Sequence, residues 1–89
     1  MPVYTYRPAV LEALLGHGVR PLPTTPPSLL REYLNDLYRY ELRQLRSRLI
    51  AGEFPKREYA SRVIALRARY PLLSLPTSAW TIRADDVQA

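Results

Sequence analysis

The chain has 89 residues with a formal net charge of +5 at pH 7, and it contains no cysteine. That length suits one domain, residues 1–89, in which folding buries only about 60–65% of the surface that the unfolded chain exposes. Disulfides, thiolate nucleophiles and cysteine metal clusters are excluded, so helix packing and association with a second chain are the remaining sources of stability.

The hydropathy pattern does not predict a membrane span, because no apolar run approaches the roughly 18–20 residues that cross a bilayer. Residues 1–6 lack the charged region and apolar core of a secretory signal. We therefore expect a soluble protein in a reducing compartment, the cytoplasm by default.

The N-terminal segment predicts an extended arm followed by a short helix. Residues 1–7 show no helical period. Pro8 occupies a first helical position and Gly16 a stop position, and the apolar residues between them fit one helix face. We predict an arm over residues 1–7 and a helix over residues 8–15.

A proline-rich connector is predicted over residues 16–27, because its prolines fix φ and remove backbone donors. Thr24, Thr25 or Ser28 is expected to cap the next helix through a side-chain oxygen. The single histidine of the chain, His17, lies in this connector, and we expect its ring to be solvated rather than catalytic.

The strongest element is a helix predicted over residues 28–51. Its leucines recur at spacings of three and four, so they share one helix face. Arg39, Arg43 and Arg46 are also spaced four and three apart, and they share the opposite face. The leucines are Leu30, Leu34, Leu37, Leu42, Leu45 and Leu49.

A second helix is predicted over residues 55–70 by an apolar stripe of the same kind. The turn at residues 52–55 is short, so the two helices are expected to be antiparallel neighbours that form a helical hairpin over residues 28–70. Glu58 and Arg62 are placed for an i,i+4 ion pair. The stripe consists of Tyr59, Val63, Leu66 and Tyr70.

The C-terminal segment, residues 71–89, is predicted to be irregular because Pro71 and Pro76 interrupt the helical pattern. A short helical turn is expected near residues 77–80, and residues 85–89 are expected to be frayed. The expected fold is all-α, with the short N-terminal helix and this segment packed on the hairpin. The apolar side chains expected to pack are Leu72, Leu73, Leu75 and Trp80.

No constellation of residues predicts catalysis. The sequence has no glycine-rich phosphate loop and no pair of histidines at metal-binding spacing. Nothing supplies a nucleophile, a base and an orienting group together. We therefore expect a protein that is not an enzyme, with no catalytic residue, no metal site and no cofactor.

Glu41 is the unusual carboxylate, because it falls inside the leucine face of the long helix. An unpaired carboxylate is costly to bury. We expect a tyrosine hydroxyl or an arginine, such as Arg48, to pair with it. The alternative is that Glu41 lines a groove with a polar mouth.

Positive charge is concentrated in residues 37–70, which hold nine basic and three acidic residues and carry +6, while the rest of the chain carries −1. Nearly all the basic residues are arginines, whose planar fork pairs bidentately with carboxylate or phosphate. We interpret the chain as a non-catalytic binding or assembly protein whose basic hairpin engages an acidic protein partner. The predicted partner-binding residues are Arg39, Arg43, Arg46, Tyr40, Arg57 and Arg62.

Two alternatives stay open. Basic residues interleaved with aromatic residues are also typical of nucleic-acid binding, which weakens steeply with salt through counterion release. In the other alternative, the protein is a structural subunit or a homodimer in which two hairpins form a four-helix bundle. A stable dimer with no other partner would favour that interpretation.

Two segments of the hairpin resemble the LYR-motif family. Leu37-Tyr38-Arg39, with Leu42-Arg43 after it, is similar to the opening signature of that family. Arg57-Glu58-Tyr59-Ala60, with Arg62, is similar to a stretch that opens the second helix in several members. The motif begins well inside the chain rather than near its N-terminus, and the family's third helix has no clear counterpart.

The resemblance implies a small accessory or assembly factor for respiratory complexes or iron–sulfur enzymes, located in the mitochondrial matrix. Many members bind acyl carrier protein, whose acyl chain enters a channel between the helices. The resemblance also implies that Arg39 and Arg43 contact acidic or phosphate groups. The residues it implies at the helix interface are Leu37, Tyr38, Leu42, Tyr59 and Val63.

Overall fold

The computed structural model describes residues 2–82 and shows an all-α protein, which confirms the predicted fold class. Three α-helices, α1 (Pro8–Gly16), α2 (Pro27–Ile50) and α3 (Tyr59–Ala68), form its body. Three 3₁₀ turns complete it: η1 (Lys56–Glu58), η2 (Pro71–Ser74) and η3 (Thr77–Ala79). Residues 85–89, which were predicted to be frayed, lie outside the described residues.

Prolines, rather than capping side chains, define where α1 and α2 begin. Pro8 and Pro27 occupy the first helical positions, and no side chain caps either helix. The prediction that Thr24, Thr25 or Ser28 caps α2 is therefore wrong. The helix begins one residue before Ser28, and the Thr25 hydroxyl instead accepts a hydrogen bond of 2.9 Å from the Leu22 amide within the connector.

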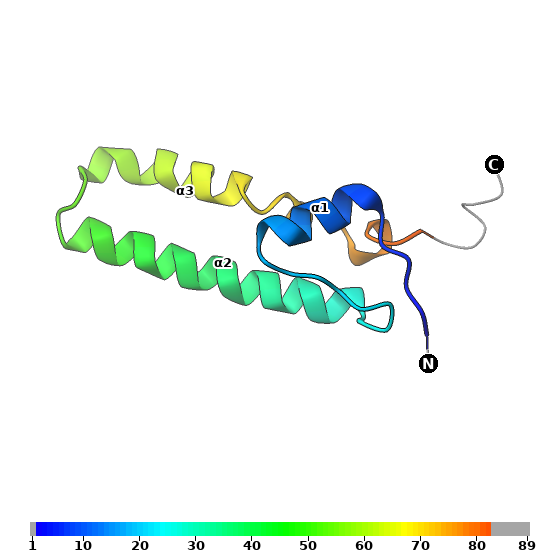
Figure 1. The fold of residues 1–89 in the computed structure, drawn as a ribbon. Helices are drawn as coiled ribbons and strands as arrows, with labels where there is room; N and C mark the ends of the chain where they lie inside the picture. Colours follow the sequence, from blue (N-terminus) through cyan, green and yellow to red (C-terminus); the bar gives the residue numbers. More distant parts are fainter. Residues whose placement is uncertain (1, 83–89) are drawn as a thin grey trace.

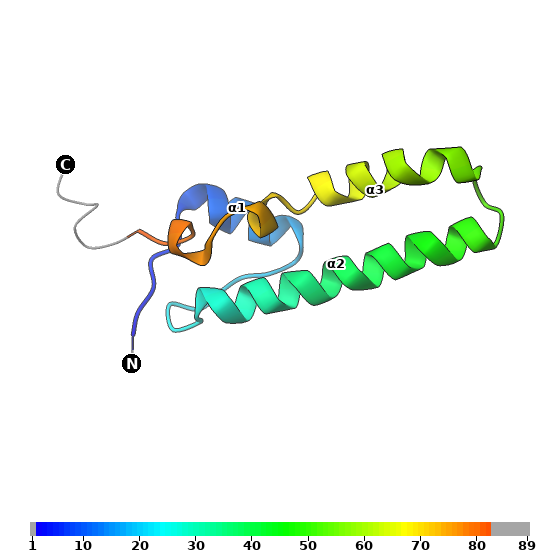
Figure 2. The same ribbon diagram turned by 180° about the vertical axis from the view of Figure 1, so that it is seen from behind.

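The helix α3 runs back along α2 after a turn at residues 51–55 (Figures 1 and 2). Gly52 in this turn has φ of +76°, a conformation that residues with a Cβ rarely adopt. The second helix begins later than predicted, because the Glu58 amide donates to the Pro55 carbonyl in a 3₁₀ turn before the α-helical hydrogen bonds start. The seam between the arms buries Leu45, Phe54 and Leu66.

The same hydrophobic core continues to the other end of the molecule, where most of its buried residues lie. Here the η2–η3 segment packs on α2 and α1 packs on η2, and these elements lie on the same side of α2 as α3 (Figures 1 and 2). An antiparallel bridge between Tyr6 and Thr81 joins the arm to the C-terminal segment. The buried residues are Tyr6, Val10, Leu14, Leu30, Leu34, Tyr70, Leu72, Leu73 and Trp80.

Leu75 does not join this core as predicted, since its side chain is 41% exposed. The backbone at Leu75 is extended between η2 and η3, and its carbonyl accepts a hydrogen bond from Arg31 of α2. A second guanidinium nitrogen of Arg31 donates to the Leu73 carbonyl at 3.0 Å. The segment is thus fastened to α2 by its backbone at Leu75 and by side-chain burial at Leu72, Leu73 and Trp80.

The molecule is elongated, with extents of 54 × 25 × 17 Å and a Cα radius of gyration of 16.3 Å. A compact chain of this length would have a radius of gyration of roughly 12 Å. We call residues 2–37 and 70–82 the head, and residues 38–69 the distal hairpin. The distal hairpin projects from the head and carries the +6 charge, because the three basic and three acidic residues of the head balance.

Candidate binding surface on the distal hairpin

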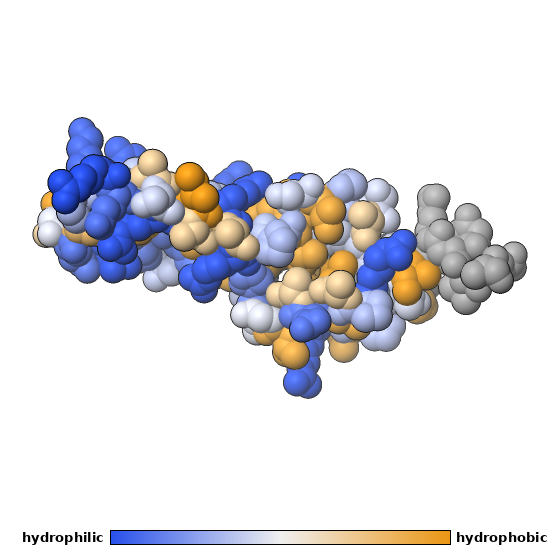
Figure 3. All heavy atoms as spheres, turned by 90° about the horizontal axis from the view of Figure 1, so that it is seen from above, coloured by the Kyte–Doolittle hydropathy of each residue, from blue (hydrophilic) through white to orange (hydrophobic). Residues whose placement is uncertain are grey.

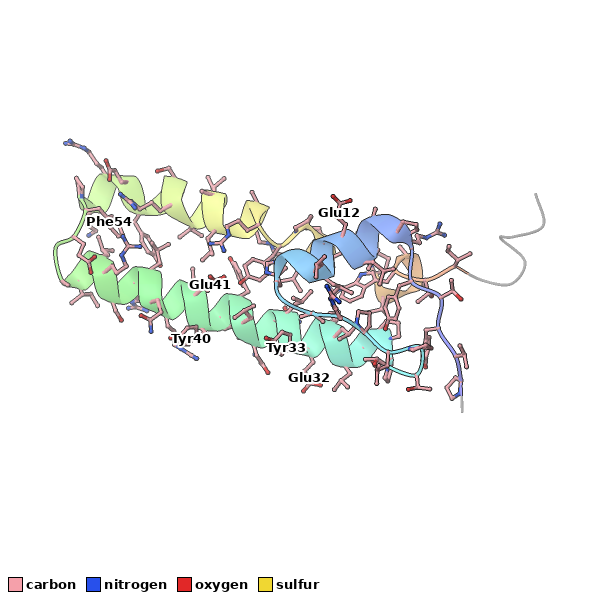
Figure 4. All side chains as sticks on the ribbon, viewed as in Figure 1. Glu12, Glu32, Tyr33, Tyr40, Glu41 and Phe54 are labelled. Carbon is pink, nitrogen blue, oxygen red and sulfur yellow. The ribbon has the colours of Figure 1, made fainter. Side chains whose placement is uncertain are left out.

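The helix α2 has two faces with different environments. Its inner face carries the leucines and is covered by α3 and the head. Its outer face carries Arg39, Arg43 and Arg46, which are all exposed, and Tyr40, which is 53% exposed. Figure 4 shows Tyr40 on the side of α2 that faces away from α3. The periodicity of the sequence thus placed the three arginines on the solvent side of the helix, and Tyr40 is exposed beside them.

Several other basic residues of the distal hairpin are already paired within it. Arg48 lies 3.2 Å from a carboxylate oxygen of Glu53. Arg69 lies 3.7 Å from Glu41. These pairs are mostly exposed, so each contributes less than about 1 kcal/mol to stability. The carboxylates of Glu53 and Glu41 do, however, neutralise the charges of Arg48 and Arg69.

Arg62 is also engaged, and this limits its predicted role. Its guanidinium lies 3.3 Å from Glu58, in the i,i+4 ion pair that the sequence predicts, and 4.2 Å from the ring centroid of the buried Phe54. Arg57 is exposed in η1, beyond the turn. The structure therefore does not bring Arg57 and Arg62 together with the arginines of the outer face of α2.

The positive charges on the outer face of α2 are not neutralised by nearby carboxylates. Within residues 2–82, no carboxylate forms an ion pair with Arg39, Arg43 or Arg46. Hydrophilic side chains also gather at the turn end of the opposite face, which Figure 3 shows. The outer face of α2 is thus one place where positive charge has no carboxylate partner among residues 2–82, and the exposed Arg67 of α3 is another.

The residues that the resemblance implies at the helix interface are all apolar or aromatic side chains turned toward the core. All five are partly buried and pack against the core: Leu37, Tyr38, Leu42, Tyr59 and Val63. Phe54 is also buried in the seam between the arms, although the helical pattern of the sequence does not point to it. Its position in the turn concealed its role, since it has no neighbour at helical spacing.

Glu41 takes part in a junction that ties the distal hairpin to the head. The Tyr70 hydroxyl donates a hydrogen bond to its carboxylate, and Arg69 forms an ion pair with it, so both expected kinds of partner are present. Arg48 is not the partner, because it reaches Glu53 across the turn. Burial and the hydrogen bond to the Glu41 carboxylate both raise the pKa of Tyr70.

His17 completes this junction, and the prediction that its ring is simply solvated is wrong. The ring stacks on Tyr70 at 4.4 Å between centroids. Its Nε2 lies 2.8 Å from the carbonyl oxygen of Arg69, which can only accept, so Nε2 is the donor. The end of α1 reaches this site from far along the chain, and no local sequence pattern reports such a contact.

Two of the open hollows beside α2 in the described residues bear on its candidate contacts. One, of about 590 Å³, lies between the connector and the first half of α2, where Leu29, Glu32, Tyr33 and Asp36 line it. The other, of about 240 Å³, lies between the two arms and is lined by three arginines beside Leu45 and Leu66. Guanidinium groups are strongly hydrated compared with hydrocarbon, so this second hollow is poorly suited to an acyl chain.

Within residues 2–82, no group of three or more His, Cys, Asp or Glu side chains is arranged to hold a metal ion. In the same part of the chain, no helix is both long and apolar enough to cross a membrane. No protein-family model, curated protein or solved structure matches this chain significantly. The site must therefore be interpreted from its own geometry and charge.

Proposed function

We propose that this chain is a non-catalytic binding protein that uses the outer face of α2 in the distal hairpin to engage an acidic protein surface. The observation that carries the proposal is the exposed row of Arg39, Arg43 and Arg46, which has no carboxylate partner in residues 2–82. An acidic surface would supply the missing charge.

Folding alone does not account for this row. Like charges spaced three or four residues apart on a helix repel each other by a few tenths of a kcal/mol. The Cα atoms of the three arginines span about 10 Å along the helix axis, given a rise of about 1.5 Å per residue. Tyr40 stands among them and offers an exposed ring with a polar tip, the kind of side chain that is enriched in protein interfaces.

The resemblance to the LYR-motif family makes acyl carrier protein a reasonable acidic probe, because Arg39 and Arg43 are the residues that it implies in acidic contacts. The proposal concerns a surface contact with such a protein and does not need an acyl channel between the arms. An assembly role would follow if this contact holds two proteins together.

The test is a binding titration of the full chain against two probes, acyl carrier protein and a short duplex DNA. We expect the acidic protein to bind the wild-type chain, and the double variant Arg39→Ala plus Arg43→Ala to bind it at least tenfold more weakly. Truncating a desolvated arginine in a charge-matched interface costs about 2–5 kcal/mol, and tenfold corresponds to about 1.4 kcal/mol.

Lys56→Glu is the matched control, because it removes the same two units of positive charge at the exposed tip of the hairpin. We expect it to leave binding of the acidic protein within about twofold of wild type. Binding of duplex DNA at physiological salt, with a steep salt dependence and no binding of the acidic protein, would identify a nucleic-acid-binding protein instead and contradict the proposal.

A further inference from the structure

A second periodic stripe runs along the outer face of α2 over its whole length. Its members alternate at spacings of four and three, which is the heptad pattern of a helix that packs against another helix. Ser47 occupies the remaining position of the pattern. We call this set the outer stripe: Leu29, Tyr33, Asp36, Tyr40, Arg43 and Ile50, with Ser47.

Every residue of the outer stripe is exposed. Its apolar and aromatic members are 56% exposed at Leu29, 50% at Tyr33, 53% at Tyr40 and 78% at Ile50. The other helices and 3₁₀ turns lie on the opposite side of α2 in both ribbon views (Figures 1 and 2). The stripe thus has the period of a packed seam, but no other helix of residues 2–82 packs on it.

Charge is segregated along the stripe and its border. The first half of α2 presents Glu32 and Asp36, and the second half presents Arg43 and Arg46, all exposed. Figure 4 shows Glu32 on the same outer side of α2 as Tyr40. An antiparallel second copy of α2 would therefore place acid against base at both ends of the contact.

The positions match as well as the charges. With a two-fold axis near Tyr40, Asp36 faces the partner's Arg43, and Glu32 lies beside the partner's Arg46. The two Tyr40 rings then meet at the centre, and Leu29 lies near the partner's Ile50. Each contact occurs twice, as an isologous interface requires. The hollow beside Leu29, lined by Glu32 and Asp36, lies where the basic end of the partner helix would dock.

We infer that the outer stripe is a homodimer interface in which α2 packs antiparallel against α2 of a second copy. This inference rests on the proposed function and names the partner of Arg43 and Arg46, since the acidic surface that they meet is the first half of α2 in the second copy. The contact spans about 32 Å of helix. Because the stripe is opposite α3, the four long helices lie in a row rather than in the four-helix bundle that two hairpins would otherwise form.

The first experiment measures the monomer–dimer equilibrium by sedimentation from about 1 µM to about 1 mM, a range that brackets weak and moderate dimers. We expect a concentration-dependent dimer for the wild-type chain. Asp36→Arg alone and Arg43→Asp alone each place two like charges in contact, so each should weaken the dimer at least tenfold. Circular dichroism should show unchanged helicity in both variants.

The decisive sample is an equimolar mixture of these two variants. A heterodimer pairs the introduced Arg with the introduced Asp and the native Arg43 with the native Asp36, so the mixture should dimerise within about threefold of wild type. Glu12→Arg on the exposed side of α1 and Lys56→Glu at the tip introduce matched charge changes outside the stripe, and neither should alter the dimer.

A wild-type chain that stays monomeric over the whole range would overturn the inference, and so would a mixture that does not recover. The titration with acyl carrier protein separates this failure from that of the proposed function. If the monomer binds that probe and needs Arg39 and Arg43 to do so, the proposed function stands and only the second copy is excluded as the partner. If the chain dimerises through the stripe, the acidic probe should compete with the dimer.

Discussion

The head and the distal hairpin differ in how completely their side chains are buried and in their net charge. The head holds the side chains with under 2% exposure, namely Trp80, Tyr70, Leu14 and Leu34, and its charges balance. The seam of the distal hairpin is buried less completely, at 6–8% for Leu45, Phe54 and Leu66, and the same region carries +6. The head therefore has the features of a folding core, whereas the hairpin has those of a presented surface.

Core truncation should separate the two regions most strongly. We expect Leu34→Ala in the head to lower the free energy of unfolding by about 4 kcal/mol, and Leu66→Ala in the distal hairpin by about 2 kcal/mol. Both lie in the range for leucine truncation, and the more enclosed site leaves the larger cavity. Urea unfolding monitored by circular dichroism measures both, and equal losses would remove the distinction between the regions.

The junction between the two regions can be tested at Tyr70. Tyr70→Phe keeps the ring that stacks on His17 but leaves Glu41 without its hydroxyl donor. We expect a loss of about 1–2 kcal/mol in the free energy of unfolding, the usual cost of an unsatisfied partly buried polar group. Tyr40→Phe is the matched control, because that tyrosine is half exposed, and it should change stability by less than about 0.5 kcal/mol.

Alkaline pH gives an independent test of the same junction. The pKa of Tyr70 is raised above its usual 10.0 by burial and by Glu41, so the unfolded chain loses the phenolic proton at lower pH than the folded chain. The stabilisation that the protonated Tyr70 hydroxyl provides is complete below the unfolded-state pKa, near 10.0, and it is lost as pH rises from there through the folded-state pKa. We expect wild type to lose stability more steeply above pH 10 than Tyr70→Phe does. Tyr6, whose pKa is also raised by burial, contributes to both proteins alike.

The turn of the distal hairpin should be less sensitive. Gly52 has a positive φ, and Gly52→Ala meets no neighbouring atom within 4 Å, so backbone strain is its main cost. We expect a loss of about 1 kcal/mol, read from the thermal midpoint. A much larger loss would mean that the tip of the hairpin contributes to the folding core, which would contradict the assignment of that core to the head.

Much of the distal hairpin could be predicted because its signals are local. The leucine spacing located α2 to within one residue at each end, and the same spacing placed Arg39, Arg43 and Arg46 on the outer face. The outer stripe was not predicted, although its four-and-three spacing runs from Leu29 to Ile50 in the sequence. The stronger leucine period on the opposite face, and the polar residues within the stripe, concealed it.

The junction could not be predicted in the same way. His17 and Arg69 are 52 positions apart, and Tyr70 and Glu41 are 29 apart, so no helical period connects them. The sequence did indicate that Glu41 needs a partner, because a carboxylate stood in an apolar face. It did not show which tyrosine would reach it, since that depends on how α1 and the segment after α3 pack on α2.

The central claim is that the outer face of α2 serves binding and not folding, and one variant tests it most directly. Arg39→Ala plus Arg43→Ala should leave the thermal midpoint of unfolding nearly unchanged, because exposed arginines contribute less than about 1 kcal/mol. The same protein should bind its acidic partner surface at least tenfold more weakly, a change of about 1.4 kcal/mol or more. A double variant that melts far earlier, or one that melts normally and binds as wild type does, would contradict the account.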